Sequence, residues 1–124
     1  MRETNPKRRI VVAVTGASGS LYARLLCGRL AASEAVGEIA LIVTGNGRRV
    51  AAYEDRIDWM DDPRYTLYDG GDLFGAPASG SARYDAMAVV PCSMGMAGRI
   101  ASGVSDSLAS RAADVMLKER RRLV

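Results

Sequence analysis

The stretch from Arg8 to Leu30, "RRIVVAVTGASGSLYARLLCGRL", decides the fold class. Its apolar run, residues 10–14, is continuous and rich in β-branched residues, which is typical of a strand buried on both faces of a parallel sheet. A Gly/Ser turn follows, and Ser20 stands near the start of a helical pattern. The leucines at helical spacing are Leu21, Leu25, Leu26 and Leu30. The stretch predicts a strand, a turn and a helix.

The same alternation continues along the chain. "EIALIV", residues 38–43, predicts a second buried strand, and Thr44 can cap a helix that ends at Glu54. "AMAVVPC", residues 86–92, predicts a third buried strand that Pro91 stops. A helix is expected beyond "SMGMAG". Another is expected in "DSLASRAADVMLKER", with Asp106 as its cap. Its predicted apolar face consists of Leu108, Ala112, Val115 and Met116.

The segment between the second and third predicted strands has a different composition. Residues 55–85, "DRIDWMDDPRYTLYDGGDLFGAPASGSARYD", are rich in Asp, Gly, Pro and Ser, with room for one short strand around residues 66–68. We interpret this segment as a long excursion, and long loops in compact domains are usually functional or disordered. It contains a second "ASGS" that precedes a strand, whereas the first follows one, so the two are not an internal repeat.

Alternating strands and helices predict an α/β fold, a Rossmann-like doubly wound parallel sheet with three α/β/α layers. Ligands of such sheets bind beyond the carboxyl ends of the strands. Leu123 and Val124 are interpreted as the start of a fourth strand. We therefore expect the chain to be part of something longer, or to be completed by a partner.

Composition narrows the class of protein. With 124 residues, 48% hydrophobic and 25% charged, we expect one globular domain over residues 1–124. A net charge of +3 without a recognition motif does not favour a nucleic acid partner. The absence of histidine excludes His-dependent triads. Cys27 and Cys92 have no metal-site spacing and are interpreted as reduced thiols. No apolar run reaches about 20 residues, so we expect a cytoplasmic protein with no membrane segment.

The Gly/Ser turn raises the question of which phosphate it could bind. A dinucleotide turn requires a third glycine where Tyr22 stands, and an acidic residue at the end of the second strand, where Thr44 stands. Both discriminating positions argue against NAD. Two readings remain for residues 16–19: a connection between strand and helix, or a site for one phosphate or a flavin edge at a helix N-terminus.

A second small-residue turn favours the ligand reading. "PCSMGMAG", residues 91–98, also joins a strand to a helix, so two such turns would meet at one crevice. Arg111, among small residues on the last helix, could bind a phosphate in a bidentate manner, although a solvated or salt-bridged arginine is the common alternative.

Three motifs carry a family resemblance. "VTGASGSLYA", "PCSMG" and above all "RAADVMLKERRRLV" resemble the UbiX-like flavin prenyltransferases, which are homo-oligomeric flavoproteins. The resemblance runs from about residue 9 to residue 124. It implies transfer of a dimethylallyl group from dimethylallyl monophosphate to N5 and then C6 of reduced FMN, without a metal. The product would serve UbiD-type decarboxylases. Family members continue beyond Val124, so we expect the C-terminal part of the family domain to be missing.

The resemblance also implies roles for individual residues. Ser18 would lie near flavin N5, Glu54 would shuttle a proton, and Lys118 would grip the substrate phosphate. The loop at Ala78, Ser79 and Gly80 would lie near the prenyl phosphate. The implied FMN contacts are Gly16, Ala17, Ser18, Thr44, Ser93, Met94, Gly95, Met96 and Arg111.

Two further classes compete with a prenyltransferase. The first is a non-catalytic FMN-binding accessory subunit of an aromatic-acid decarboxylase system. The second is an FMN-dependent cysteine decarboxylase, which we disfavour because that group relies on a catalytic histidine and this chain has none.

Overall fold

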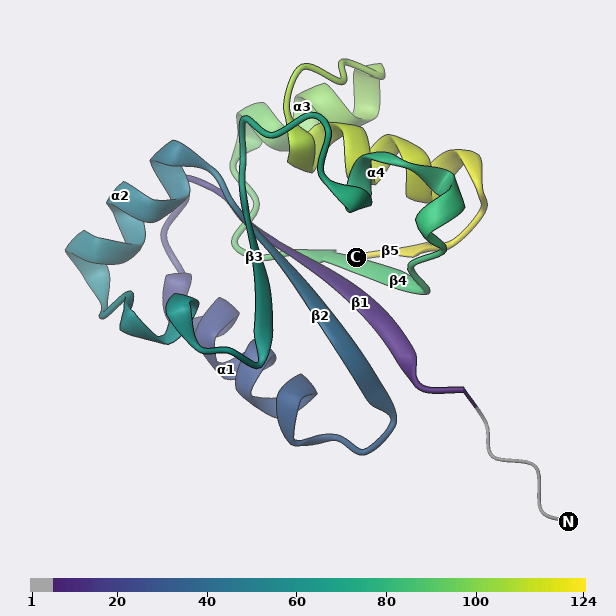
Figure 1. Ribbon diagram of the computed structural model, residues 1–124. Helices are drawn as coiled ribbons and strands as arrows, with labels where there is room; N and C mark the ends of the chain where they lie inside the picture. Colours follow the sequence, from purple (N-terminus) through teal and green to yellow (C-terminus); the bar gives the residue numbers. More distant parts are fainter. Residues whose placement is uncertain (1–5) are drawn as a thin grey trace, which may run out of the picture.

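The computed structural model describes residues 6–124, which form a five-stranded parallel sheet flanked by helices (Figure 1). The strands are β1 (Arg8–Val14), β2 (Val36–Val43), β3 (Tyr65–Asp69), β4 (Ala86–Val89) and β5 (Arg122–Leu123). The helices are α1 (Ser20–Ala32), α2 (Gly45–Glu54), α3 (Met94–Ser102) and α4 (Leu108–Lys118). Three short 3-10 helices lie in the excursion: η1 (Asp58–Asp61), η2 (Ala76–Ala78) and η3 (Gly80–Ala82).

The strand order, β3-β2-β1-β4-β5, places a topological switch point next to β1. From β1 the chain builds outward through β2 to β3, and it then returns to add β4 and β5 on the other side. Val11 of β1 is opposite Ala40 of β2 and Met87 of β4, with all three strands parallel. The carboxyl ends of β1 and β4 are therefore neighbours, which is where open α/β sheets bind ligands.

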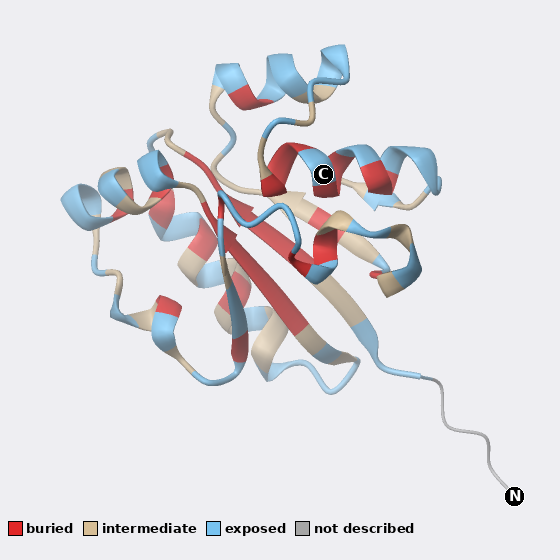
Figure 2. Ribbon diagram, turned by 45° about the horizontal axis from the view of Figure 1, so that its top comes forward, coloured by how far each residue is buried: buried red, intermediate tan, exposed pale blue. Residues whose placement is uncertain are grey.

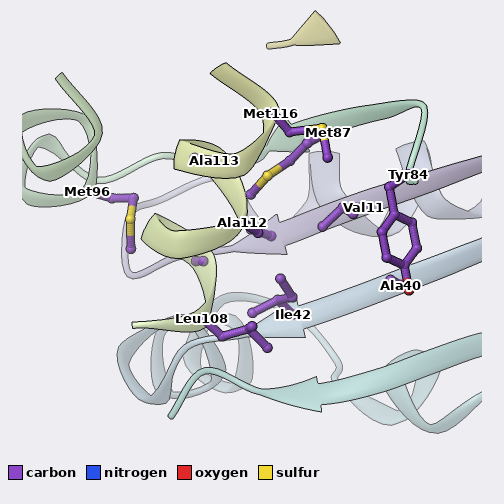
Figure 3. Close-up of a cluster of buried hydrophobic side chains, with 12 residues drawn as sticks. Val11, Ala40, Ile42, Tyr84, Met87, Met96, Leu108, Ala112, Ala113 and Met116 are labelled. Carbon is purple, nitrogen blue, oxygen red and sulfur yellow. The ribbon is translucent and has the colours of Figure 1, made fainter. Parts of the chain in front are cut away.

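The sheet is buried on both faces, which confirms the predicted three-layer α/β/α class. Successive β1 residues belong to different hydrophobic clusters, because side chains alternate across a strand. Val12 and Val14 pack with α1, α2 and η1, whereas Val11 and Ala13 pack with α3 and α4. Figure 2 shows the buried centre of the sheet between these layers. In Figure 3, Leu108, Ala112 and Met116 of α4 lie over the strands, as their spacing predicted.

The buried face of helix α1 is centred differently from the face that its leucine spacing predicts. Leu21 and Leu25 are 43% and 51% exposed, and the buried residues of α1 are Ser20, Ala23 and Cys27. Small side chains let this helix approach the sheet closely, and Leu26 and Leu30 pack beside them against the same cluster, whereas Leu21 and Leu25 lie on the exposed side. Burial raises the pKa of Cys27 to about 12, so its thiol stays protonated at neutral pH.

Several predicted boundaries need correction. The cap of α4 is Ser107, not Asp106, because the Ser107 hydroxyl accepts from the Ser110 amide in a capping box. Strand β4 ends at Val89 rather than Cys92. The short strand expected around residues 66–68 is a full partner of β2, so the strand near the C-terminus is the fifth and not the fourth. Within residues 6–124, no helix has the length and apolar character needed to cross a bilayer.

Candidate functional site

A cleft of about 470 Å³ opens at the carboxyl edge of the sheet. The loops that follow β1, β2, β3 and β4 all contribute to it, as does the segment before α4. Its lining residues are Thr15, Gly16, Thr44, Gly45, Asn46, Gly70, Ser93, Met96, Arg99, Asp106 and Ser107. The volume lies within the range of small-molecule sites, about 300–1,000 Å³.

Glycines allow these loops to approach one another. A Cβ on Gly16 would lie 2.6 Å from Cβ of Asn46, so the β1 and β2 loops touch there. A Cβ on Gly47 would lie 2.3 Å from the Val14 carbonyl oxygen, and one on Gly70 would lie 2.9 Å from a Thr44 backbone atom. Side chains at these positions would force the loops apart and widen the cleft.

Thr15 joins the β1 loop to the β4 loop. Its side chain is buried, its hydroxyl donates to the Pro91 carbonyl oxygen at 2.6 Å, and it accepts from the Ser93 amide at 2.9 Å. This one hydroxyl thus holds two strand ends together, because it donates one hydrogen bond and accepts another. Sequence reasoning missed this role, although a hydroxyl residue directly after a buried strand was a usable signal.

Two helices begin at the cleft with hydroxyl caps. Thr44 accepts from the Gly47 amide at 2.9 Å at the start of α2, and Ser93 accepts from the Met96 amide at 3.1 Å at the start of α3. The remaining amides of a first helical turn lack intrahelical acceptors, and the helix dipole favours an anion there. This end of the cleft can therefore hold a phosphate or a polar ring edge.

Arg99 of α3 brings a positive charge to the cleft. Its Nε lies 3.4 Å from a carboxylate oxygen of Asp106, and both side chains are about half exposed. Sequence reasoning missed Arg99, because an arginine on a helix gives no sign of which side it faces. Asn46, Gly70 and Ser107 were also missed, since each enters the cleft only through the packing of separate loops.

The "GASG" turn binds the carboxylate of Glu54. Oε2 of Glu54 accepts from the Ser18 hydroxyl, and Oε1 accepts from the Gly19 amide at 3.1 Å and from the Ser20 hydroxyl at 3.3 Å. Helix α1 has no side-chain cap of its own, because its N-cap is Gly19 in a left-handed conformation. Glu54 therefore supplies the anion at the α1 N-terminus. The Ser18 hydrogen bond, followed by that from Gly19, lowers the pKa of Glu54.

The α3 residues predicted to line a flavin differ in exposure. Met94 is 87% exposed and Gly95 is exposed on the first turn of α3, whereas Met96 is buried beneath the cleft. Gly16 and Ala17 are half-buried on the β1 loop, next to exposed Ser18. Four of the predicted residues thus line the cleft: Gly16, Thr44, Ser93 and Met96. Ala17, Ser18, Met94 and Gly95 are not among the residues that line it.

The residues expected to bind the substrate phosphate lie elsewhere. Lys118 is exposed at the C-terminal end of α4, 3.9 Å from Glu119. The loop at Ala78, Ser79 and Gly80 packs near the same end, and the Gly80 carbonyl accepts from Arg121 at 3.2 Å. The other end of α4 faces the cleft, because the Leu108 amide donates to the Gly70 carbonyl at 2.9 Å. An 11-residue helix is about 16 Å long, so this chain does not bring the residues expected to bind the substrate phosphate next to the cleft.

Arg111 is also separate from the cleft lining. It lies on the exposed side of α4 and is not among the residues that border the cleft. Its assignment as an FMN contact stays a prediction from the resemblance.

Comparisons with known proteins agree with the fold. The family model described as Flavoprotein matches residues 1–124. The flavin prenyltransferase UbiX of Methanocaldococcus jannaschii is 39% identical over 118 residues, covering 94% of this chain and 62% of that protein. The UbiX of Archaeoglobus fulgidus is 41% identical over 118 residues, covering 94% and 64%. The chain thus spans less than two thirds of the length of these relatives.

Solved structures show the same likeness. A UbiX crystal structure in complex with FMN and dimethylallyl pyrophosphate superposes with a TM-score of 0.85 at 39% identity, covering 95% of this chain and 63% of that one. A dodecameric FMN-dependent UbiX-like decarboxylase from Escherichia coli O157:H7 gives a TM-score of 0.86 at 32% identity, covering 93% and 63%.

Proposed function

Because the chain belongs to the Flavoprotein family, we propose that it binds FMN in the cleft at the carboxyl ends of β1 and β4. The donor set fits a flavin mononucleotide: the α2 and α3 N-termini and Arg99 suit its phosphate, and the hydroxyls suit polar ring atoms. The glycines at the loop contacts let the loops approach closely, which keeps the cleft narrow, as a flat ring requires. A bound FMN in a similar solved structure supports this assignment.

The proposed reaction is transfer of a dimethylallyl group from dimethylallyl monophosphate to reduced FMN. Reduced FMN would supply the nucleophilic ring atoms, N5 and C6. Attack on the prenyl carbon breaks its bond to the phosphate oxygen, and the phosphate leaves with the electron pair. The second bond, to C6, would form from the prenyl double bond, which would take up one proton while C6 releases one. A group that can give and accept a proton is therefore needed within reach.

One observation carries the proposal: the Glu54 carboxylate lies on the turn that would face the flavin. Hydrogen bonds from Ser18 and Gly19 hold it there and favour its ionised form at neutral pH. An ionised carboxylate accepts a proton, and the Ser18 hydroxyl, which donates to Glu54, would relay it in this proposal. The proposal includes a homo-oligomeric, cytoplasmic protein that delivers its product to a UbiD-type decarboxylase.

The test is anaerobic incubation of the protein with reduced FMN and dimethylallyl monophosphate, followed by mass spectrometry of the extracted flavin. We expect a flavin that carries one added dimethylallyl group. Bound FMN without product would refute the transferase and leave a flavin-binding protein. A protein that takes up no FMN would refute both.

The second candidate is a non-catalytic FMN-binding accessory subunit. A specific observation favours it: Lys118 and the loop at Ala78–Gly80 lie at the opposite end of α4 from the cleft. Within one chain, the residues expected to bind the prenyl phosphate are therefore not assembled beside the flavin. A titration of FMN-loaded protein with dimethylallyl monophosphate separates the two, since only the transferase is expected to bind it.

A further inference from the structure

The C-terminal end of α2 carries two consecutive carboxylates that bind two sites on α1. Glu54 accepts from the turn at Ser18 and Gly19 and from the Ser20 hydroxyl. Asp55 accepts from Arg24, with Nε to Oδ2 at 2.8 Å and Nη2 to Oδ1 at 3.5 Å. Ser20 and Arg24 are four residues apart, so they share one face of α1. One surface hollow of about 370 Å³ is lined by Ser20 and Arg24 of α1 together with Glu54 and Asp55.

The last turn of α2 is itself outside the apolar packing, and the nearest residues that join the hydrophobic cluster are Ala51 before it and Ile57 after it. The buried residues of α2 are Gly47 and Ala51, so the last apolar anchor lies three residues before Glu54. Tyr53 is almost fully exposed, and the Glu54 side chain is exposed as well. The position of the Glu54 carboxylate therefore depends on polar contacts.

The Arg24–Asp55 pair is the better-protected of those contacts. The side chains are 27% and 20% exposed, and a charge-assisted pair with two N–H···O contacts has a defined geometry. The Arg24 hydrogen bond lowers the pKa of Asp55, so the pair is ionised at neutral pH. The guanidinium also lies beside the C-terminal end of α2, where the helix dipole favours a positive charge.

From this geometry we propose that Arg24 and Asp55 are positioning residues, which hold the end of α2 against α1 so that the Glu54 carboxylate stays on the Ser18–Gly19 turn. The pair acts through the backbone next to Glu54 and does not touch the cleft lining. The catalytic consequence rests on the proposed prenyl transfer, and the geometric consequence does not. Loss of the pair should slow proton transfer and leave FMN affinity unchanged.

The test is Asp55→Ala, with the pKa of Glu54 read by NMR titration of its carboxyl carbon. Removing a neighbouring negative charge would by itself lower the Glu54 pKa. Losing the position would remove the Ser18 and Gly19 hydrogen bonds and raise the pKa toward the ordinary value of about 4.3. We expect the rise. The two effects have opposite signs, so a merely electrostatic role is distinguishable.

The kinetic arm measures single-turnover prenyl transfer at saturating reduced FMN. Asp55→Ala should be slower by about tenfold to a hundredfold, as for a misplaced catalytic group, with the FMN dissociation constant within about twofold. Asp55→Glu, which keeps a carboxylate for Arg24, should recover most of the rate. Arg29→Leu is the matched control, since Arg29 is on α1 and makes no ion pair among the described residues.

Each outcome has a distinct meaning. A Glu54 pKa that falls or stays constant in folded Asp55→Ala overturns the positioning role, whatever the turnover. A wild-type protein that makes no prenylated FMN refutes the proposed function, and the NMR arm still decides the positioning role. If Asp55→Ala does not fold, Asp55→Asn, with a weaker acceptor for Arg24, takes its place.

Discussion

The two ends of helix α4 differ in how the neighbouring loops are held. At the N-terminal end, beside the cleft, the loops meet through glycines and neutral hydroxyls, such as Gly47 against Val14 and Thr15 between two strand ends. At the C-terminal end, the excursion is attached to the amino edge of the sheet by charged side chains. Arg121 there donates to the Gly80 carbonyl at 3.2 Å.

Arg9 is the centre of the charged end. Its Nε lies 2.6 Å from Glu38, its guanidinium donates to the Ala82 carbonyl, and it covers the Tyr84 ring at 4.3 Å from the centroid. Burial raises the pKa of Tyr84, so its ring stays neutral beneath the cation. Here the Arg9 guanidinium is paired within the chain, whereas Arg121 donates through Nη2 and its buried Nη1 has no hydrogen-bond partner among the described residues.

The difference teaches where a ligand can bind. At the cleft, the loops are joined by close backbone approach, which leaves helix N-terminal amides and Arg99 available to an anion. At the charged end, the guanidinium groups of Arg9 and Arg121 are used to hold the excursion. We therefore expect cleft variants to change flavin chemistry, and variants at the charged end to change stability.

The largest expected effect is on catalysis, at the Glu54 carboxylate on the Ser18–Gly19 turn. Glu54→Gln keeps an oxygen that can accept from the Gly19 amide but cannot accept the released proton. We expect prenyl transfer to fall by about 10²–10⁴-fold, as for loss of a general base, with FMN still bound. Single-turnover mass spectrometry checks the rate. Turnover that survives intact would show that the proton leaves by another route.

Arginine variants test which guanidinium group binds FMN. Arg111→Ala is expected to weaken FMN binding by about 1.5–3 kcal/mol, the usual effect of losing a charge-assisted contact. Arg99→Met, at the cleft, is expected to lose about 1 kcal/mol, since Asp106 already shares its guanidinium. Fluorescence titration with FMN measures both. Unchanged binding in Arg111→Ala alone would remove Arg111 from the site.

The glycine contacts are tested by Gly47→Ala. The added Cβ would lie 2.3 Å from the Val14 carbonyl oxygen, so β1 and α2 must separate. We expect the free energy of unfolding in urea to fall by about 1–3 kcal/mol. Gly98→Ala is the control, because its Cβ in α3 would meet no atom within 4 Å. That variant should gain about 0.5–1 kcal/mol. Equal effects in the two variants would contradict the packing argument.

The smallest expected effect is at the charged end. Arg9→Met removes the contacts with Glu38, Ala82 and Tyr84, and we expect the free energy of unfolding to fall by about 1–2 kcal/mol. FMN affinity should not change. Arg8→Met, whose ion pair with Asp85 is longer and more exposed, should cost at most about 0.5 kcal/mol. A loss of FMN affinity in Arg9→Met would show that the two ends of α4 are coupled.

Local patterns predicted most of the secondary structure and four of the eleven residues that line the cleft. The continuous apolar runs, the Thr44 cap and the apolar face of α4 are short-range signals, and the structure confirms each of them. The leucine spacing of α1 was half right: Leu26 and Leu30 pack against the core, whereas Leu21 and Leu25 are exposed, because spacing alone does not show where the buried face is centred. The Asp106 cap was wrong because Ser107, the next residue, forms the capping box.

The sequence by itself determined the order of elements and the small-residue turns after the strands, because periodicity, capping and turn chemistry act between residues close in the chain. Only the tertiary structure decided which turns share a cleft, through the strand order β3-β2-β1-β4-β5. It also decided that Glu54 accepts a hydrogen bond from Ser18, 36 residues away, whereas Lys118 lies at the end of α4 that is far from the cleft. Contacts at such separations depend on the packing of helices on the sheet, which no local pattern encodes.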